Sequence, residues 1–345
     1  MTETHGLLMN NLQDFLDAAE RQNTRRSYAS ALRHFEVEWN GLLPATADMV
    51  ARYLADFAST LSINTLKLRL AALSRWHTTQ GFPDPTKALV VRQTLKGIRT
   101  LHPSCEKKAR PLQLDVLQEV DSWLLSGIAA AKQENNQVRL LRLTRDRALL
   151  LLGFWRGFRS DELVRLEIEH VCIAHGEGLT CYIPRSKTDR NAEGRTVRCP
   201  TLSRLCPVAA YEAWLAVSHL TSGTVFRRID RWGHLASDGL AASSIIPLLR
   251  RLLAAVGVAK AEEYSSHSLR RGFAGWANDN GWDLKDLMEY VGWRDIKSAL
   301  RYLDTSPIRL KERFEQGLAE VPPPAKASSP APKAPHLRLI EFPQK

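Results

Sequence analysis

A dispersed set of charged and aromatic side chains constrains the fold and chemistry of this chain more than any other sequence feature. In chain order, the set is Arg159, Glu162, Lys187, His267, Arg270, Trp293 and Tyr302. His267 and Arg270 are three residues apart, so on a helix they share one face and can point at a single anion. Tyr302, on a separate short helix, could reach the same anion as a nucleophile. Two arginines, a lysine, a histidine and a tyrosine suit attack on a phosphodiester without a metal ion.

This order and spacing resemble the tyrosine recombinase (phage integrase) family. The family's motifs begin with an Arg, an acidic residue three positions later and a Lys in a β-hairpin. They continue with His-x-x-Arg, a Gly-His or Gly-Trp pair, and a Tyr nine residues after that pair. This chain has each of these motifs in the same order. Most members have a second His where this chain has Trp293. The Trp version resembles the Cre branch, whose proteins resolve or exchange DNA at two identical sites. The resemblance covers roughly residues 8–318, and six short motifs in register make it specific.

The resemblance implies a mainly α protein with two domains. Residues 8–101 would form an N-terminal helical bundle, a SAM-like core-binding domain that contacts DNA. Residues 111–318 would form a mixed α/β, mostly helical tyrosine-recombinase catalytic domain with a small antiparallel sheet. A length of 345 residues is enough for two domains, each with its own core.

Hydrophobic periodicity independently predicts helices in both halves. In the first half, apolar stripes predict helices that begin near Asn23, Thr46 and Asn64, and a last helix over about 85–101. In the second half, Ser160 and Asp295 are the expected caps of the helices that follow Arg159 and carry Tyr302. Thr180–Pro184 and Arg195–Cys199 are predicted strands, joined by a polar loop that contains Lys187.

Two segments look like connections rather than core elements. Residues 102–111 combine two prolines, Pro103 and Pro111, with a basic cluster, and 102–110 are predicted to be an interdomain linker, although an ordinary surface loop fits equally well. Residues 319–345 are rich in Pro and Ala and are predicted to be disordered. Between them, Ser306–Leu318 could form a helix that docks on a neighbouring protomer or, almost as readily, on its own domain.

A basic face lies opposite the apolar stripes of the N-terminal helices. Its members, the candidate DNA-binding residues, are Arg25, Arg26, Arg33, Lys67, Arg69 and Arg75. A face of this kind is usually no more than solvated. The resemblance makes contact with the DNA backbone or major groove the better explanation.

Bulk properties agree with a polyanionic partner. The net charge is +11 and the isoelectric point is about 9.6. Five scattered cysteines form no CxxC pair, which indicates reduced thiols. No apolar run reaches eighteen residues, and the N-terminus shows no secretory signal, so we expect a cytoplasmic protein with no membrane partner.

The resemblance assigns a role to each member of the set. Arg159 and Arg270 would neutralise charge on the pentavalent phosphorus, and Tyr302 would be the nucleophile. His267 could donate to a phosphate oxygen or accept the tyrosine proton, and Glu162 would orient its neighbours. Lys187 would protonate the leaving 5′ oxygen, whereas Trp293 can donate a hydrogen bond but cannot shuttle a proton.

Each role competes with an ordinary structural one. Single arginines often form surface ion pairs, a helical Tyr more often packs, and a loop Lys is usually only a solvated charge. Tyr290 is the nearest rival nucleophile, but its position before Gly292-Trp293 resembles that of a core residue.

The predicted function is therefore site-specific DNA recombination through a 3′-phosphotyrosine and a Holliday junction. By the family's mechanism, four protomers would assemble on two double-stranded sites, and neither a metal ion nor another cofactor would be needed. The alternatives are a type IB topoisomerase-like relaxing enzyme and a non-catalytic DNA-binding regulator on the same fold. The sequence does not determine the DNA target site. It also does not determine whether the biological role is phage integration, transposon resolution or plasmid dimer resolution.

Overall fold

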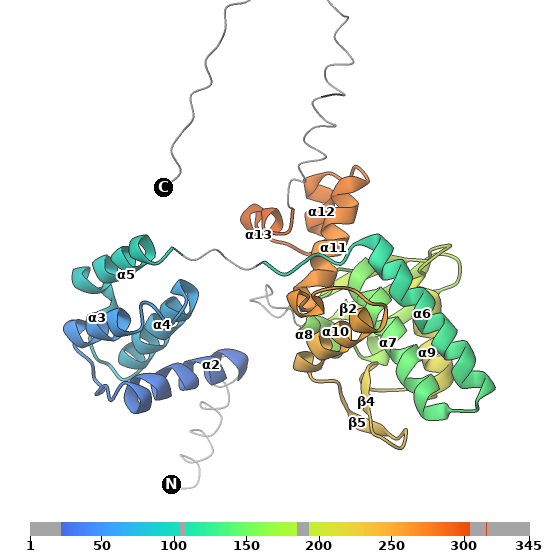
Figure 1. Cartoon of the computed structure of the whole chain (residues 1–345), viewed down its shortest axis with the longest axis horizontal. Helices are drawn as coiled ribbons and strands as arrows, with labels where there is room; N and C mark the ends of the chain where they lie inside the picture. The colour runs from blue at the N-terminus through green and yellow to red at the C-terminus, as the bar shows by residue number, and fades with distance from the viewer. Residues whose placement is uncertain (1–21, 104–107, 185–192, 304–314, 316–345) are drawn as a thin grey trace, which may run out of the picture. The chain divides into compact units, whose positions relative to one another are not determined.

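The computed structural model describes residues 22–103, 108–184 and 193–303, together with Glu315. The chain divides into two compact units, Met1–Lys108 and Ala109–Lys345 (Figure 1). The predictions for Lys187, for the 319–345 tail and for all of the Ser306–Leu318 helix except Glu315 lie outside the described residues.

The N-terminal unit consists of short helices around one apolar core. Its elements are α2 (Gln22–Arg33), the π-helical turn η1 (His34–Glu38), α3 (Ala47–Asp56), α4 (Ile63–Thr79), the 3-10 turn η2 (Pro85–Lys87) and α5 (Leu89–Leu101). Thr46 and Ser62 begin α3 and α4 by accepting backbone N–H groups with their side-chain oxygens. The apolar stripes meet in a core that contains Phe35, Val50, Tyr53, Leu54, Leu66 and Leu73. The predicted helices are confirmed.

The second unit is larger and also mainly helical. Its helices are α6 (Leu114–Gln133), α7 (Gln137–Trp155), α8 (Ser160–Val164), α9 (Pro207–Ser218), α10 (Ile245–Ala255), α11 (Ser266–Asp279), α12 (Leu284–Val291) and α13 (Ile296–Leu300), with 3-10 turns η3 (Ile168–His170), η4 (Ala242–Ser244) and η5 (Ala261–Glu263). Helix α7 packs against α6, α9 and α11. Its last two turns, from Ala148 to Phe154, are therefore buried on all sides.

Two small antiparallel sheets complete this unit. The first has the order β1 (Val171–Ala174), β2 (Gly178–Ile183) and β3 (Arg195–Pro200), and the second pairs β4 (Arg227–Ile229) with β5 (Leu235–Gly239). Strands β2 and β3 agree with the prediction, whereas β1, β4 and β5 were not predicted. The sequences of β4 and β5, Arg-Arg-Ile and Leu-Ala-Ser-Asp-Gly, have few β-branched or aromatic residues and no clear alternation, so pairing rather than propensity makes them strands.

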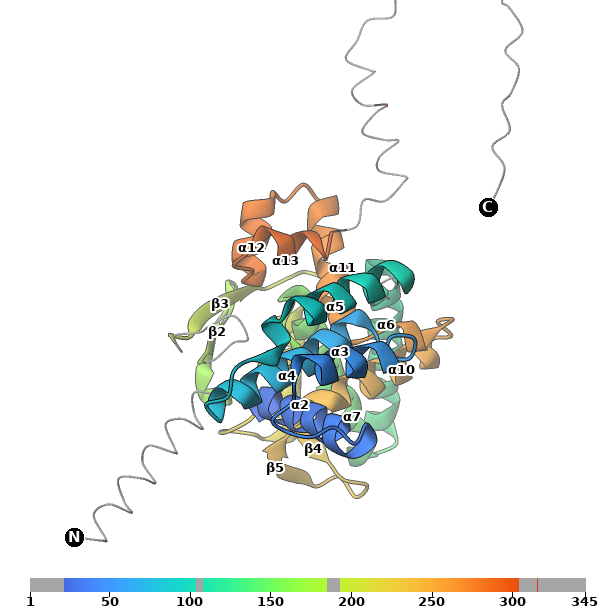
Figure 2. The ribbon, with the colours of Figure 1, turned by 90° about the vertical axis from the view of Figure 1, so that its left-hand side faces the viewer.

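The mainly α fold with small antiparallel sheets is confirmed. Both views place the β4–β5 hairpin and the α12–α13 pair at opposite ends of the second unit (Figures 1 and 2). None of the helices in the described parts is long and apolar enough to cross a bilayer.

Candidate active site

Arg159 and Glu162 form an ion pair at the start of α8. The Arg159 Nη1 atom lies 2.8 Å from Glu162 Oε1, and the Arg159 backbone N–H donates to Glu162 Oε2 at 3.0 Å. Arg159 is therefore the N-cap and Ser160 the first helical residue, so the prediction that Ser160 caps this helix is wrong. The Glu162 carboxylate instead accepts the Arg159 backbone N–H with Oε2, while its Oε1 holds the Arg159 guanidinium.

The Glu162 carboxylate is buried but remains ionised. Burial alone would raise its pKa, but the positive charges of Arg159 and Arg195 and the hydrogen bond from the Arg159 backbone outweigh that effect, so the pKa is lowered. An ionised carboxylate in this position can hold two guanidinium groups at the same time.

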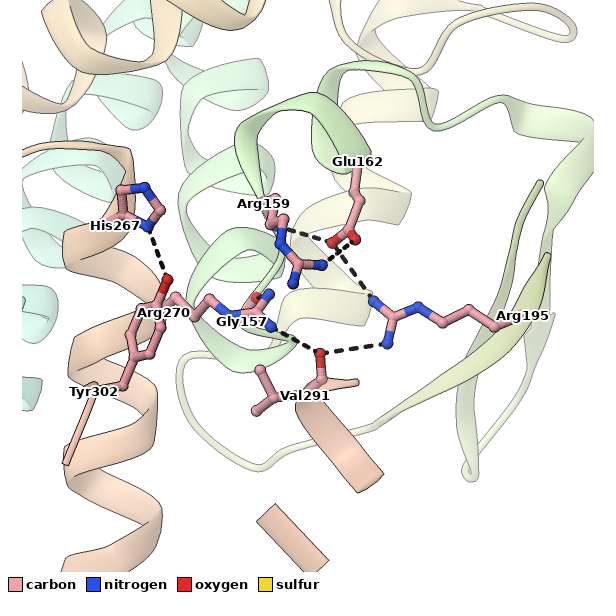
Figure 3. Close-up of polar contacts among 8 residues, drawn as sticks. All are labelled: Gly157, Arg159, Glu162, Arg195, His267, Arg270, Val291 and Tyr302. Atoms are coloured by element: carbon pink, nitrogen blue, oxygen red, sulfur yellow. Dashed lines mark hydrogen bonds and ion pairs between the residues drawn. The ribbon is translucent and has the colours of Figure 1, made fainter. Parts of the chain in front are cut away.

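Arg270 is almost completely buried on α11. Its Nη1 donates to the Gly157 carbonyl at 2.8 Å and its Nη2 to the Val291 carbonyl at 3.2 Å (Figure 3). Gly157 has a φ of +58°, a conformation that favours glycine, and the turn it forms presents this carbonyl to Arg270. Burial lowers the pKa of Arg270 to about 9, so the guanidinium keeps its charge at neutral pH.

Tyr302 and His267 meet although they come from different segments. The Tyr302 hydroxyl lies 3.0 Å from His267 Nδ1 (Figure 3). Asp295 caps α13 as predicted, but α13 ends at Leu300, so Tyr302 lies in the turn that follows the helix rather than within it. The Tyr302 backbone N–H still donates to the Ala299 carbonyl, which keeps that turn attached to α13.

Trp293 is buried between the nucleophile candidate and Arg270. Its ring centroid lies 5.1 Å from that of Tyr302, and the Arg270 guanidinium carbon lies 5.0 Å from the Trp293 centroid. The indole thus packs on both groups at once, and this contact can fix the Tyr302 ring by van der Waals and cation–π attraction.

Arg195, the first residue of β3, joins this group, although from the sequence it was predicted only to begin a strand. Its Nη2 lies 3.5 Å from Glu162 Oε2, and its Nη1 donates to the Val291 carbonyl at 3.3 Å. A polar residue at a strand end carries no specific sequence signal, so only the tertiary structure reveals this contact. The structure therefore brings together six of the seven predicted residues and adds Arg195; Lys187 is outside the described part.

Tyr290, the rival nucleophile candidate, makes contacts typical of a packed side chain. Its hydroxyl donates to the Trp155 carbonyl at 3.0 Å, and burial raises its pKa. This environment fits a packed core tyrosine.

Across the described ranges, no cluster of three or more His, Cys, Asp or Glu side chains could hold a metal ion.

The candidate DNA-binding residues of the N-terminal unit lie on α2 and α4. Arg26, Arg33, Lys67 and Arg75 are exposed. Arg69 is half-buried and donates to the Ser30 carbonyl at 2.9 Å, so it joins α4 to α2. Contact with DNA stays a prediction for all six residues.

A model of the phage integrase family matches residues 131–308, just over half of the chain. The chain belongs to this family of tyrosine recombinases. The matched segment contains Arg159, Glu162, Lys187, His267, Arg270, Trp293 and Tyr302.

Individual family members are similar over most of their length. An integrase/recombinase XerD homolog from Selenomonas ruminantium is 27% identical over 304 residues, which cover 85% of this chain and 84% of that protein. Recombinase Cre of Escherichia phage P1 is 22% identical over 298 residues, 81% of this chain and 80% of Cre. Placement in the Cre branch stays a prediction that depends on Trp293.

Solved structures share the fold. The XerH site-specific recombinase, in a post-cleavage complex with its palindromic difH substrate, has a TM-score of 0.59 at 20% identity over 84% of this chain and 78% of that chain. A lambda integrase dimer bound to a COC′ core site has a TM-score of 0.54 at 17% identity, over 87% of this chain and 95% of that chain.

Proposed function

We propose that this protein is a site-specific DNA recombinase that cuts and rejoins double-stranded DNA through a phosphotyrosine bond at Tyr302. One observation carries the proposal: the Tyr302 hydroxyl lies 3.0 Å from His267 Nδ1, while the Arg270 guanidinium carbon lies 5.8 Å from the centroid of the same tyrosine ring. A hydroxyl paired with a base and next to a buried cation is the arrangement that nucleophilic attack on a phosphodiester requires.

In the proposed reaction, the Tyr302 oxygen attacks the scissile phosphorus. A P–O bond to tyrosine forms, the P–O5′ bond breaks, and the tyrosine proton passes to Nδ1 of a neutral His267. Arg159 and Arg270 donate to the non-bridging oxygens as negative charge grows there. Lys187 gives a proton to the departing 5′ oxygen. A 5′ hydroxyl from a second strand then attacks the 3′-phosphotyrosine and restores the phosphodiester.

The proposed organisation follows the family. Residues 8–101 would bind DNA and residues 111–318 would carry out catalysis, with 102–110 as the linker between them. XerH and lambda integrase have been crystallised on DNA, which supports a duplex substrate for this chain. We further propose a tetramer on two sites that passes through a Holliday junction, acting in the cytoplasm.

A covalent-trapping assay tests the proposal. Nicked duplexes that tile the DNA flanking the gene are incubated with the protein, and a denaturing gel is used to detect a protein–DNA adduct. A regulator without catalysis gives no adduct with any duplex. A plasmid with two copies of the trapped site then separates recombination, which changes the connectivity of the DNA, from relaxation alone. Adduct formation that disappears with EDTA and returns with Mg²⁺ would contradict the metal-independent mechanism.

A further inference from the structure

We infer that Arg195 is a positioning residue for the cleavage reaction. Its guanidinium contacts both the Glu162 carboxylate, which holds Arg159, and the Val291 carbonyl, at the start of the segment that leads to Tyr302. The inference rests on the proposed function and assigns a role to a side chain outside the predicted set. Arg195 acts through its neighbours and does not itself touch the reacting atoms.

The first contact is with Glu162. One carboxylate oxygen, Oε2, receives both the Arg159 backbone N–H at 3.0 Å and Arg195 Nη2 at 3.5 Å, while Oε1 receives Arg159 Nη1 at 2.8 Å. The Glu162 side chain is only 1% exposed, so water contributes little to these contacts. Without Arg195, one of the arginines whose positive charge keeps this buried carboxylate ionised would be absent.

The second contact is with the end of α12. Arg195 Nη1 and Arg270 Nη2 both donate to the carbonyl of Val291, at 3.3 and 3.2 Å (Figure 3). Val291 is the last residue of α12, and Gly292 and Trp293 follow it directly. Because Trp293 packs on the Tyr302 ring, the position of this carbonyl helps to determine where the nucleophile lies.

Gly292 provides independent support for this placement. Its φ is +77°, and a Cβ atom built on it would overlap the Arg195 guanidinium. The guanidinium therefore packs directly on the Gly292 backbone, and the Gly of the Gly-Trp pair leaves room for it.

Only an arginine can make both contacts. Its planar group carries two separate Nη atoms, which here reach acceptors on α8 and at the end of α12. The single ammonium of a lysine can serve one of these acceptors at a time. Arg195 thus links the Arg159–Glu162 pair to the Arg270–Val291 contact.

The test compares Arg195→Ala and Arg195→Lys with Arg198→Ala. Arg198 lies on the same strand with an exposed side chain, so its loss removes the same charge without removing the two contacts. The full-length proteins are compared in single-turnover cleavage of the trapped nicked duplex, in equilibrium binding to the same duplex, and in thermal melting.

We expect Arg195→Ala to cleave roughly 10²-fold more slowly, the typical loss when reacting groups shift by about 1 Å. Its DNA affinity should stay within about threefold of wild type, and Arg195→Lys should be intermediate in rate. Methylguanidinium in solution should fill the space left in Arg195→Ala and raise its rate at least about tenfold, with no such gain for wild type or Arg198→Ala.

Several results would overturn the inference. Normal cleavage by Arg195→Ala would show that the contacts are dispensable. Parallel loss of binding and cleavage would make Arg195 a DNA contact, and unfolding of both Arg195 variants would make it a purely structural residue. The absence of an adduct with the wild-type protein would instead remove the proposed function, and the inference with it.

Discussion

The hydroxyl of Tyr302 lies 3.0 Å from Nδ1 of His267, although the two residues are 35 positions apart in the chain. His267 and Arg270 share α11, so this single contact brings the candidate nucleophile next to both a base and a buried cation. The ring centroid of Tyr302 is 5.8 Å from the Arg270 guanidinium carbon. Developing negative charge on the tyrosine oxygen would therefore be stabilised from the start of the reaction.

Replacing Tyr302 with Phe should abolish covalent attachment to DNA and leave duplex binding nearly unchanged. The hydroxyl is the proposed nucleophile, but it adds little to the affinity for phosphate. Tyr290→Phe is the matched control: its hydroxyl donates to the Trp155 carbonyl, so its loss should cost roughly 0.5–1.5 kcal/mol of stability and leave the adduct intact. An adduct trapped with Tyr302→Phe would assign the nucleophile to another residue.

Arg270→Lys should lower the rate of cleavage by roughly 10²–10³-fold, the usual loss when one donor to a transition-state oxyanion is removed. A lysine keeps the charge but cannot serve the Gly157 and Val291 carbonyls together while facing a phosphate. The measurement is single-turnover adduct formation at saturating DNA. A rate within about threefold of wild type would show that charge alone, without the arginine geometry, is sufficient at this position.

The Glu162 carboxylate should make the stability of the protein depend on pH. Its pKa in the folded state is below its ordinary value of 4.5, so it stabilises the fold above that value, and the contribution is lost as the pH falls through the lower, folded-state pKa. Glu162→Gln should therefore lower the free energy of unfolding at pH 7 by roughly 1.5–3 kcal/mol, the range for hydrogen bonds to charged groups. The difference from wild type should shrink in acid.

Urea unfolding at several pH values measures this difference. Asp161→Asn is the control, because its ion pair with Arg165 is at the surface and should contribute less than about 1 kcal/mol at any pH. A Glu162→Gln deficit that is constant from pH 7 to strongly acidic conditions would contradict an ionised carboxylate in the folded protein.

The sequence predicted which side chains lie close together where a family motif sets their order and spacing. His267, Arg270 and Tyr302 could be paired from their order alone, because a family motif encodes contacts that are distant in sequence. The partners of these residues were not predictable. Arg270 is held by two backbone carbonyls, and every residue has a carbonyl, so no residue type marks Gly157 or Val291 as acceptors.

Two predicted helix boundaries, the start of α8 and the end of α13, differ from the structure. Ser160 is a better intrinsic cap than Arg159, but the carboxylate of Glu162 satisfies the Arg159 amide and moves the start of α8. Tyr302 continues the apolar pattern of α13, yet the helix ends two residues earlier. In the first case, contacts made across one turn outweigh the intrinsic preference of a single residue.

The proposed general-acid role of Lys187 can be tested by cleavage kinetics, although Lys187 lies outside the described residues. Lys187→Ala should slow cleavage by roughly 10²–10⁴-fold, the usual contribution of a positioned general acid. The measurement is single-turnover adduct formation on the trapped duplex. Duplex affinity should change little, because a single lysine contributes only a small part of the phosphate contacts.

Replacing the bridging 5′ oxygen of the scissile phosphate with sulfur distinguishes loss of a proton donor from loss of charge stabilisation. A thiolate leaves without protonation because its pKa is far below that of an alkoxide, so this substrate should restore most of the rate lost in Lys187→Ala. The same substrate should give no comparable gain to Arg159→Ala, because the missing guanidinium is proposed to act on the non-bridging oxygens. If both variants were rescued equally, or neither were, Lys187 would not be the general acid.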